Sequence, residues 1–150
     1  MTSLDDDIDN LTRIPLFAIF EPGALRMLAF SSETRLLRAG DALFRRGEES
    51  DCGYILTMGA IALLTHDDGR SPAHVLRPWA LIGEIALVTP SLRPVTARAL
   101  EPSTVLRISR ALFHQILEQH PSTAARARDF FRERLVDFSR NAAAGLGVKH

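Results

Sequence analysis

A series of short, extended apolar runs between residues 33 and 109 constrains the fold of this chain more than any other feature. Turn signals such as Ala39-Gly40, Asp68-Gly69 and Glu101-Pro102-Ser103 separate the runs. Short strands with a turn about every 8–12 residues are typical of an all-β sandwich or barrel. The predicted strands are 34–38, 41–45, one between Gly47 and Gly59, 60–65, 71–77, 95–100 and 104–109.

Helical periodicity precedes these strands. Asp5, Asp6 and Asp7 stand before apolar residues at helical spacing, and acidic side chains stabilise a helix N-terminus. This favours capping over a metal site and predicts a short helix that ends near Pro15. Pro22 lies just inside a second predicted helix, over residues 21–31.

Helical periodicity also follows the strands. Ser109 is a suitable N-cap for a helix over residues 110–120, and a last helix is predicted over 123–141. That last helix carries an apolar stripe, which either packs against the strands or pairs with its copy in a homodimer. The stripe consists of Ala127, Phe131, Leu135 and Phe138. The chain is thus predicted as one domain over 1–141, with helices over 5–31, strands over 33–109, helices over 110–141 and a flexible tail over 142–150.

Composition narrows the class of protein. The 150 residues carry 18 basic and 18 acidic side chains, so the formal net charge is zero and a nucleic-acid partner is not expected. Cys52 is the only cysteine, which excludes an internal disulfide and fits a reducing compartment. The N-terminus lacks the features of a signal peptide, and no apolar run approaches the ~20 residues of a membrane span. We expect a cytoplasmic protein that does not bind membranes.

No catalytic pattern stands out. The chain contains no Ser-His-Asp spacing, CxxC pair, Walker loop or HExxH motif. His66, Asp67 and Asp68 are adjacent before Gly69, which favours a hairpin turn over a metal site. We therefore expect no enzymatic activity, no catalytic residue, no cofactor and no metal.

The segment from Leu81 to Ala99, called the central segment below, carries the most chemistry. Gly83 and Glu84 precede an apolar run long enough for one helical turn, and Arg93 follows a turn-rich stretch. Free amide groups of a helical turn attract anions, and a guanidinium offers a planar fork to phosphate oxygens. A carboxylate accepts hydrogen bonds from sugar hydroxyls, and glycine permits close approach of a ligand. The segment suits a small phosphorylated sugar ligand; the alternative is a surface salt bridge on a turn.

These residues resemble the phosphate-binding cassette of the cyclic nucleotide-binding domain family, which includes the cAMP receptor protein and the regulatory subunits of cAMP-dependent kinase. Glu84 and Arg93 are nine positions apart (93 − 84), as in that family. The cassette-like residues are Gly83-Glu84-Ile85-Ala86-Leu87, Arg93, Thr96 and Ala99. A second family-like motif comprises Gly47, Asp51, Tyr54, Ile55 and Gly59.

The resemblance implies a fold and a set of ligand contacts. The fold is mainly β: an eight-stranded, jelly-roll-like β-roll with N-terminal helices and a C-terminal helix that acts as a lid or dimer contact. Glu84 is expected to bind the ribose 2′-hydroxyl and Arg93 the cyclic phosphate. The other expected ligand-binding residues are Ile82, Gly83, Ile85, Ala86, Pro94 and Val95. Two positions depart from the family pattern: Pro94 lacks a backbone N–H, and Trp79 replaces a usual glycine.

The resemblance also implies a function. We expect a cyclic nucleotide sensor or regulatory protein, with cAMP as the first candidate ligand and cGMP as the second, which signals in trans to an unknown effector protein. The sequence ends where family transcription factors continue into a helix-turn-helix domain, so a stand-alone binding domain is expected. The alternative is a fold that has lost ligand binding and serves as a dimerisation or protein-interaction module.

Overall fold

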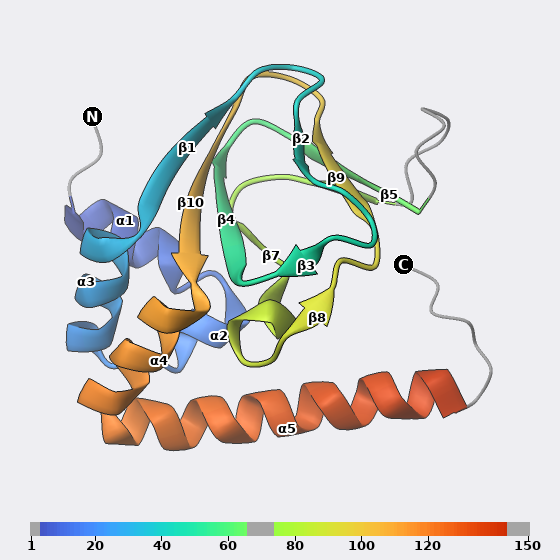
Figure 1. Cartoon of the computed structure of the whole chain (residues 1–150). Coiled ribbons are helices and arrows are strands. Elements are labelled where there is room, and N and C mark those ends of the chain that lie inside the picture. Colours follow the sequence, from blue (N-terminus) through green and yellow to red (C-terminus); the bar gives the residue numbers. More distant parts are fainter. Residues whose placement is uncertain (1–3, 66–73, 144–150) are drawn as a thin grey trace.

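The computed structural model of the chain describes residues 4–65 and 74–143 and shows a rolled set of antiparallel strands with helices at one end (Figure 1). Ten strands form among the described residues. They are β1 (Glu33–Leu37), β2 (Ala42–Phe44), β3 (Glu49–Ser50), β4 (Cys52–Met58), β5 (Ile61–Leu64), β6 (His74–Leu76), β7 (Ala80–Ile82), β8 (Ser91–Leu92), β9 (Thr96–Ala99) and β10 (Ser103–Ser109).

The strands form two four-stranded sheets and one short pair. The orders are β1-β10-β4-β7 and β2-β9-β5-β6, and β3 pairs with β8. All pairings are antiparallel, and β10 bonds to both β1 and β4 along most of its length. β4 in turn pairs Tyr54 with Ile82 of β7, which places the start of the central segment beside the middle of the roll. The predicted mainly β fold with flanking helices is confirmed.

Apolar side chains of both sheets fill the inside of the roll. The buried Arg93 lies beside this roll core, against the rings of Phe44 and Tyr54. Burial of apolar surface contributes roughly 25 cal/mol per Å², so these side chains hold the two sheets together. The roll core consists of Leu43, Phe44, Cys52, Tyr54, Leu56, Ile61, Ile82, Val95, Ala97, Ala99 and Val105.

In the part of the chain that the structure describes, five α-helices gather at the end of the roll that carries the central segment (Figure 1). They pack around a second apolar core that includes Phe17, Leu28, Phe113 and Ile116. The partly buried Trp79 packs against this helical core. The helices are α1 (Leu4–Leu11), α2 (Pro15–Ala18), α3 (Pro22–Ser31), α4 (Arg110–Gln119) and α5 (Pro121–Ala143).

Two prolines begin helices instead of ending them. Pro15 was expected near the end of the first helix, but α1 ends at Leu11 and Pro15 opens α2. Pro121 likewise opens α5, two residues before the predicted start of the last helix at residue 123. Proline fits the first position of a helix because its N–H would have no intrahelical partner there. The predicted N-cap is confirmed, since Ser109 Oγ accepts a hydrogen bond from the Leu112 amide at 3.0 Å.

The start of α5 is fastened to the N-terminal helices. Thr123 is fully buried; its hydroxyl accepts a hydrogen bond from the Glu21 amide at 3.1 Å, while the Glu21 carboxylate accepts from the Thr123 amide at 3.2 Å. Ser122 also donates to this carboxylate. These bonds hold Glu21 as an acceptor and lower its pKa, with Ser122 the largest contribution. The N-terminal end of α5 is therefore anchored.

The described part of the apolar stripe on α5 packs against its own chain. Ala127 and Phe131 are buried, and the Phe131 ring meets Phe113 edge to face at 6.0 Å between centroids. The side chains of Leu135 and Phe138 lie outside the described residues, as do the predicted turn at 66–70 and most of the predicted tail. Within residues 4–65 and 74–143, no helix is long and apolar enough to cross a membrane.

Candidate functional site

The central segment begins with a glycine that bends the chain into a short helix. Gly83 has a φ of 78°, in the left-handed region that favours glycine, and follows the end of β7. Residues Glu84–Leu87 then form a 3₁₀ helix, η1, in which the Ala86 amide donates to the Gly83 carbonyl at 3.1 Å. The predicted single helical turn is confirmed. Figure 1 shows this segment between the strands of the roll and α5.

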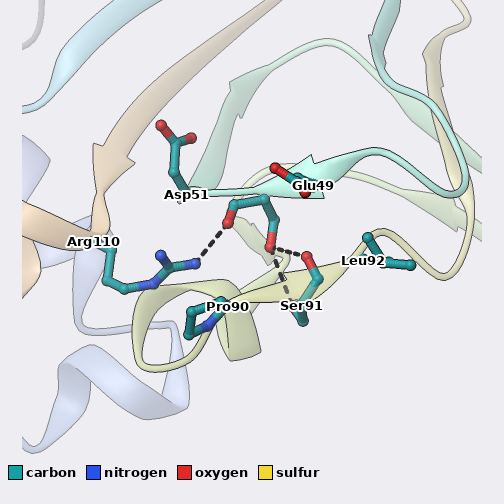
Figure 2. Close-up of a pocket in the computed structure, with 7 residues that line it drawn as sticks. Glu49, Asp51, Pro90, Ser91, Leu92 and Arg110 are labelled. Atoms are coloured by element: carbon teal, nitrogen blue, oxygen red, sulfur yellow. Dashed lines mark hydrogen bonds between the residues drawn. The ribbon is translucent and has the colours of Figure 1, made fainter.

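A second arginine, Arg110 at the first position of α4, holds the segment in place. Its Nε donates to the Ala86 carbonyl at 2.8 Å, and its Nη2 donates to Thr89 at 3.2 Å and to Ser50 at 2.6 Å. Figure 2 shows the Arg110 guanidinium directed toward β3, with its hydrogen bond to the Ser50 carbonyl as a dashed line. The sequence analysis missed this residue. Its position in the sequence could have identified it, because a cation at a helix N-terminus is unfavourable with respect to the helix dipole and must be stabilised by other contacts.

Arg93, in the second half of the central segment, is almost completely buried. Only 5% of the residue is exposed, and its Nη2 donates to the Cys52 carbonyl at 2.8 Å. Its guanidinium carbon lies 4.3 Å from the centre of the Phe44 ring and 5.8 Å from that of Tyr54. In the part of the chain that the structure describes, no carboxylate forms an ion pair with Arg93. Among the described residues, the buried guanidinium is contacted by the Cys52 carbonyl and sulfur and by two aromatic faces instead of a carboxylate.

Arg93 also touches the backbone at the start of η1. A Cβ atom placed on Gly83 would come within 2.5 Å of Arg93 Nη1, closer than real contacts allow. The missing side chain at Gly83 therefore makes room for the guanidinium. This contact brings the cation directly against the helical turn whose first amide groups have no intrahelical acceptor.

Glu84 points to a different part of the molecule. Its carboxylate forms an ion pair with Arg134 of α5, at 3.8 Å between Oε1 and Nε. Burial raises the pKa of Glu84, and the Arg134 charge opposes that shift. The pair lies in a groove of about 410 Å³ that α2, Trp79 and Leu81 also line. Arg93 does not line this groove, so the two predicted ligand-binding side chains, nine positions apart in the sequence, face different spaces.

The remaining predicted site residues divide into buried and accessible ones. Ile82 and Val95 belong to the roll core, and Pro94 is exposed. Ala86 is buried, and both its amide and its carbonyl are already bonded within the chain. Ile85 is half-buried. Gly83, Glu84 and Ile85 are each partly exposed, so these residues and Pro94 are the accessible members of the predicted site.

A larger hollow of about 690 Å³ lies between β3, β8 and the start of α4 (Figure 2). Ser50 Oγ donates across it to the Ser91 carbonyl at 2.6 Å. Glu49 and Asp51 also line the hollow, and Asp51 pairs with Arg107 at 3.3 Å. With two carboxylates on its wall and the Arg110 guanidinium bonded to three carbonyls, this hollow is a poor site for a phosphate.

Comparison with known proteins defines the class to which this fold and segment belong. The sequence model of the cyclic nucleotide-binding domain matches residues 34–120, which span the roll, the central segment and α4. The chain belongs to this family.

Two solved structures support the assignment. A cyclic nucleotide-binding-like protein from Brucella abortus is 44% identical, with a TM-score of 0.69; the match covers 76% of this chain and 99% of that one. The N-terminal domain of a transcriptional regulator from Streptomyces coelicolor is 31% identical, with a TM-score of 0.77, over 93% of this chain and 96% of that one.

A curated relative is much longer than this chain. The lysophospholipase nte1 of Aspergillus fumigatus is 25% identical over 130 residues, which is 85% of this chain. The chain spans only 8% of the length of that protein.

Proposed function

We propose that this protein binds a cyclic nucleotide, with cAMP as its ligand, and acts in the cytoplasm as a sensor or regulatory protein for a partner protein. The observation that carries the proposal is Arg93. Its guanidinium is buried at the start of η1, without a carboxylate partner among the described residues. Removing a cation from water is unfavourable unless an opposite charge accompanies it, and a cyclic phosphate supplies that charge.

The burial of Arg93 implies that the backbone against it, at Gly83 and the start of η1, moves when ligand binds. A phosphate cannot reach a side chain that is only 5% exposed unless the covering backbone opens. Ligand binding then shifts the segment between a closed and an open arrangement, by as much as its affinity for the two differs. Glu84 links the same segment to α5 through Arg134, so α5 is the element that would report the change.

The choice of cAMP over cGMP rests on the residue after the arginine. In the family, a threonine beside the arginine favours cGMP, and Pro94 has neither a hydroxyl nor an amide hydrogen to offer. The proposal assigns no catalytic step to this chain. The lysophospholipase name belongs to a far longer protein, of which this chain matches a small part.

A second candidate function is a protein-interaction module that has lost its ligand. The observation in its favour is that Phe44 and Tyr54 cover the buried Arg93 guanidinium, the group that would have to meet the phosphate. Thermal unfolding separates the two candidates, because a ligand that binds only the folded state stabilises it by RT ln(1 + [L]/Kd). A sensor gains about 2.7 kcal/mol at a cAMP concentration 100 times Kd. An interaction module shows the same melting temperature with and without cAMP, cGMP or cyclic di-GMP.

Glu84→Gln is expected to weaken cAMP binding by roughly fivefold to tenfold, less than loss of Arg93. Glutamine keeps an acceptor oxygen but not the charge that strengthens a hydrogen bond to the ribose 2′-hydroxyl. A 2′-deoxy analogue should lose affinity for the wild type but little for the variant. The control is Arg134→Gln, which removes the ion pair and keeps Glu84, and should retain the penalty for the 2′-deoxy analogue. Equal penalties in the wild type and Glu84→Gln would show that Glu84 does not contact this hydroxyl.

We also propose that α5 supports a homodimer. The helix spans 23 residues, and Ala127 and Phe131, in its first half, pack against the chain's own core. Leu135 continues the apolar spacing toward the C-terminus. Sedimentation at tens of micromolar should give the mass of a dimer, and Leu135→Glu should give a folded monomer. A wild-type monomer, with and without nucleotide, would refute the dimer.

A further inference from the structure

Phe44 is placed beneath the central segment by an irregularity in β2. Opposite β9, Ala42 pairs with Arg98 and Phe44 with Ala97, so two residues advance on β2 against one on β9. Such a bulge redirects side chains. As a result the consecutive residues Leu43 and Phe44 are both buried in the roll core. The bulge thus directs a second consecutive side chain, that of Phe44, toward the inside of the roll, where it contacts Arg93.

The Phe44 ring is the nearer of two aromatic faces around the Arg93 guanidinium. Its centre lies 4.3 Å from the guanidinium carbon, compared with 5.8 Å for Tyr54, and the two rings are nearly parallel at 27°. The face of an aromatic ring carries negative potential, and its attraction for a cation increases when both are removed from water. Arg93 and Phe44 are 5% and 8% exposed, so this contact is dry.

The other groups around Arg93 do not replace this contact. The Cys52 carbonyl and sulfur accept from Nη2, at 2.8 and 3.5 Å, and so fix one edge of the guanidinium. Burial raises the pKa of Tyr54 to about 12, so its phenol stays neutral and offers no counter-charge. The Phe44 ring packs against the flat face of the guanidinium, while the absence of a side chain at Gly83 leaves room for Nη1 beside η1.

We propose that Phe44 is a positioning residue for the nucleotide site: its ring holds the Arg93 guanidinium against the backbone of Gly83, ready for the ligand phosphate. This inference rests on the proposed cyclic nucleotide binding. It implies that Arg93 stays in place when ligand binds and that the backbone above it is the part that opens. We assign Phe44 no direct contact with the ligand, so that it acts only through Arg93.

The test compares cAMP affinity by calorimetric titration in matched variants. Phe44→Leu removes the ring face and should weaken binding roughly 10- to 30-fold. Phe44→Tyr restores a ring and should bind within about threefold of the wild type. Phe20→Leu is the control, because Phe20 is equally well buried, 6% against 8% exposed, but lies in the helical core. Phe20→Leu should lower stability and leave the affinity unchanged.

Repeating the Phe44→Leu change in a protein that lacks Arg93 distinguishes a role through the arginine from a general role in stabilising the fold. In an Arg93→Ala background, Phe44→Leu should change the remaining affinity by less than about twofold, because residues that act through one contact are not additive. An undiminished effect in that background would overturn the proposal. So would unchanged or tighter binding by Phe44→Leu itself, since the ring would then be dispensable or would hold Arg93 away from the ligand. If the wild type binds no cyclic nucleotide, the proposed function fails, a result distinct from these.

Discussion

Arg93→Ala is expected to weaken cAMP binding 10- to 100-fold while the protein stays folded. A hydrogen bond to a charged group contributes about 1.5–3 kcal/mol, and each 1.4 kcal/mol is a factor of ten in affinity. The fold should persist because the variant removes a buried cation that no described carboxylate neutralises. Circular dichroism checks folding, and calorimetric titration measures the affinity.

Arg93→Lys is the matched variant for this experiment. Lysine keeps the positive charge but lacks the planar fork that engages two phosphate oxygens at once. It should therefore bind cAMP more tightly than Arg93→Ala and less tightly than the wild type. Folded Arg93→Ala protein that binds cAMP as tightly as the wild type would refute the role of this residue.

Gly83→Ala should disturb both stability and binding. The backbone at Gly83 has a φ of 78°, and an L-residue in the left-handed region costs about 1–2 kcal/mol. The added Cβ would also lie 2.5 Å from Arg93 Nη1, so the guanidinium must leave its position. We expect a loss of about 2 kcal/mol in the free energy of unfolding and at least a tenfold loss of cAMP affinity. Urea denaturation and calorimetric titration measure the two effects.

Gly40→Ala separates backbone strain from displacement of the arginine. Gly40 also has a positive φ, 91°, but nothing lies within 4 Å of a Cβ placed there. This control should lose a similar amount of stability and keep the wild-type affinity. If Gly83→Ala also keeps the wild-type affinity, Arg93 does not need its observed position in order to bind the ligand.

The longer strands and the helix boundaries with clear signals were predictable from sequence. β4 and β10 are long, apolar and bounded by turns, and Ser109 caps α4 as its residue type predicts. β3 and β8 were missed because each has two residues and forms only by pairing with the other across the molecule. β7 was missed for a related reason, since its three residues are fixed by their pairing with β4. Long-range pairing of this kind leaves no local pattern.

The candidate site was predictable in its residues but not in its geometry. The spacing of Gly83, Glu84 and Arg93 identified the segment, and the helical turn is present. The directions of the side chains were not predictable, because they depend on distant partners: Phe44 and Cys52 for Arg93, and Arg134 for Glu84. Arg110 escaped notice for the same reason, since its acceptors on Ser50, Ala86 and Thr89 are brought together only by the fold.

Isothermal titration of the wild-type protein with cAMP, cGMP and cyclic di-GMP tests the central claim most directly. We expect saturable binding of cAMP at one site per chain, weaker binding of cGMP and no binding of cyclic di-GMP. Absence of binding heat for all three nucleotides at millimolar concentration, with the protein folded, would contradict it.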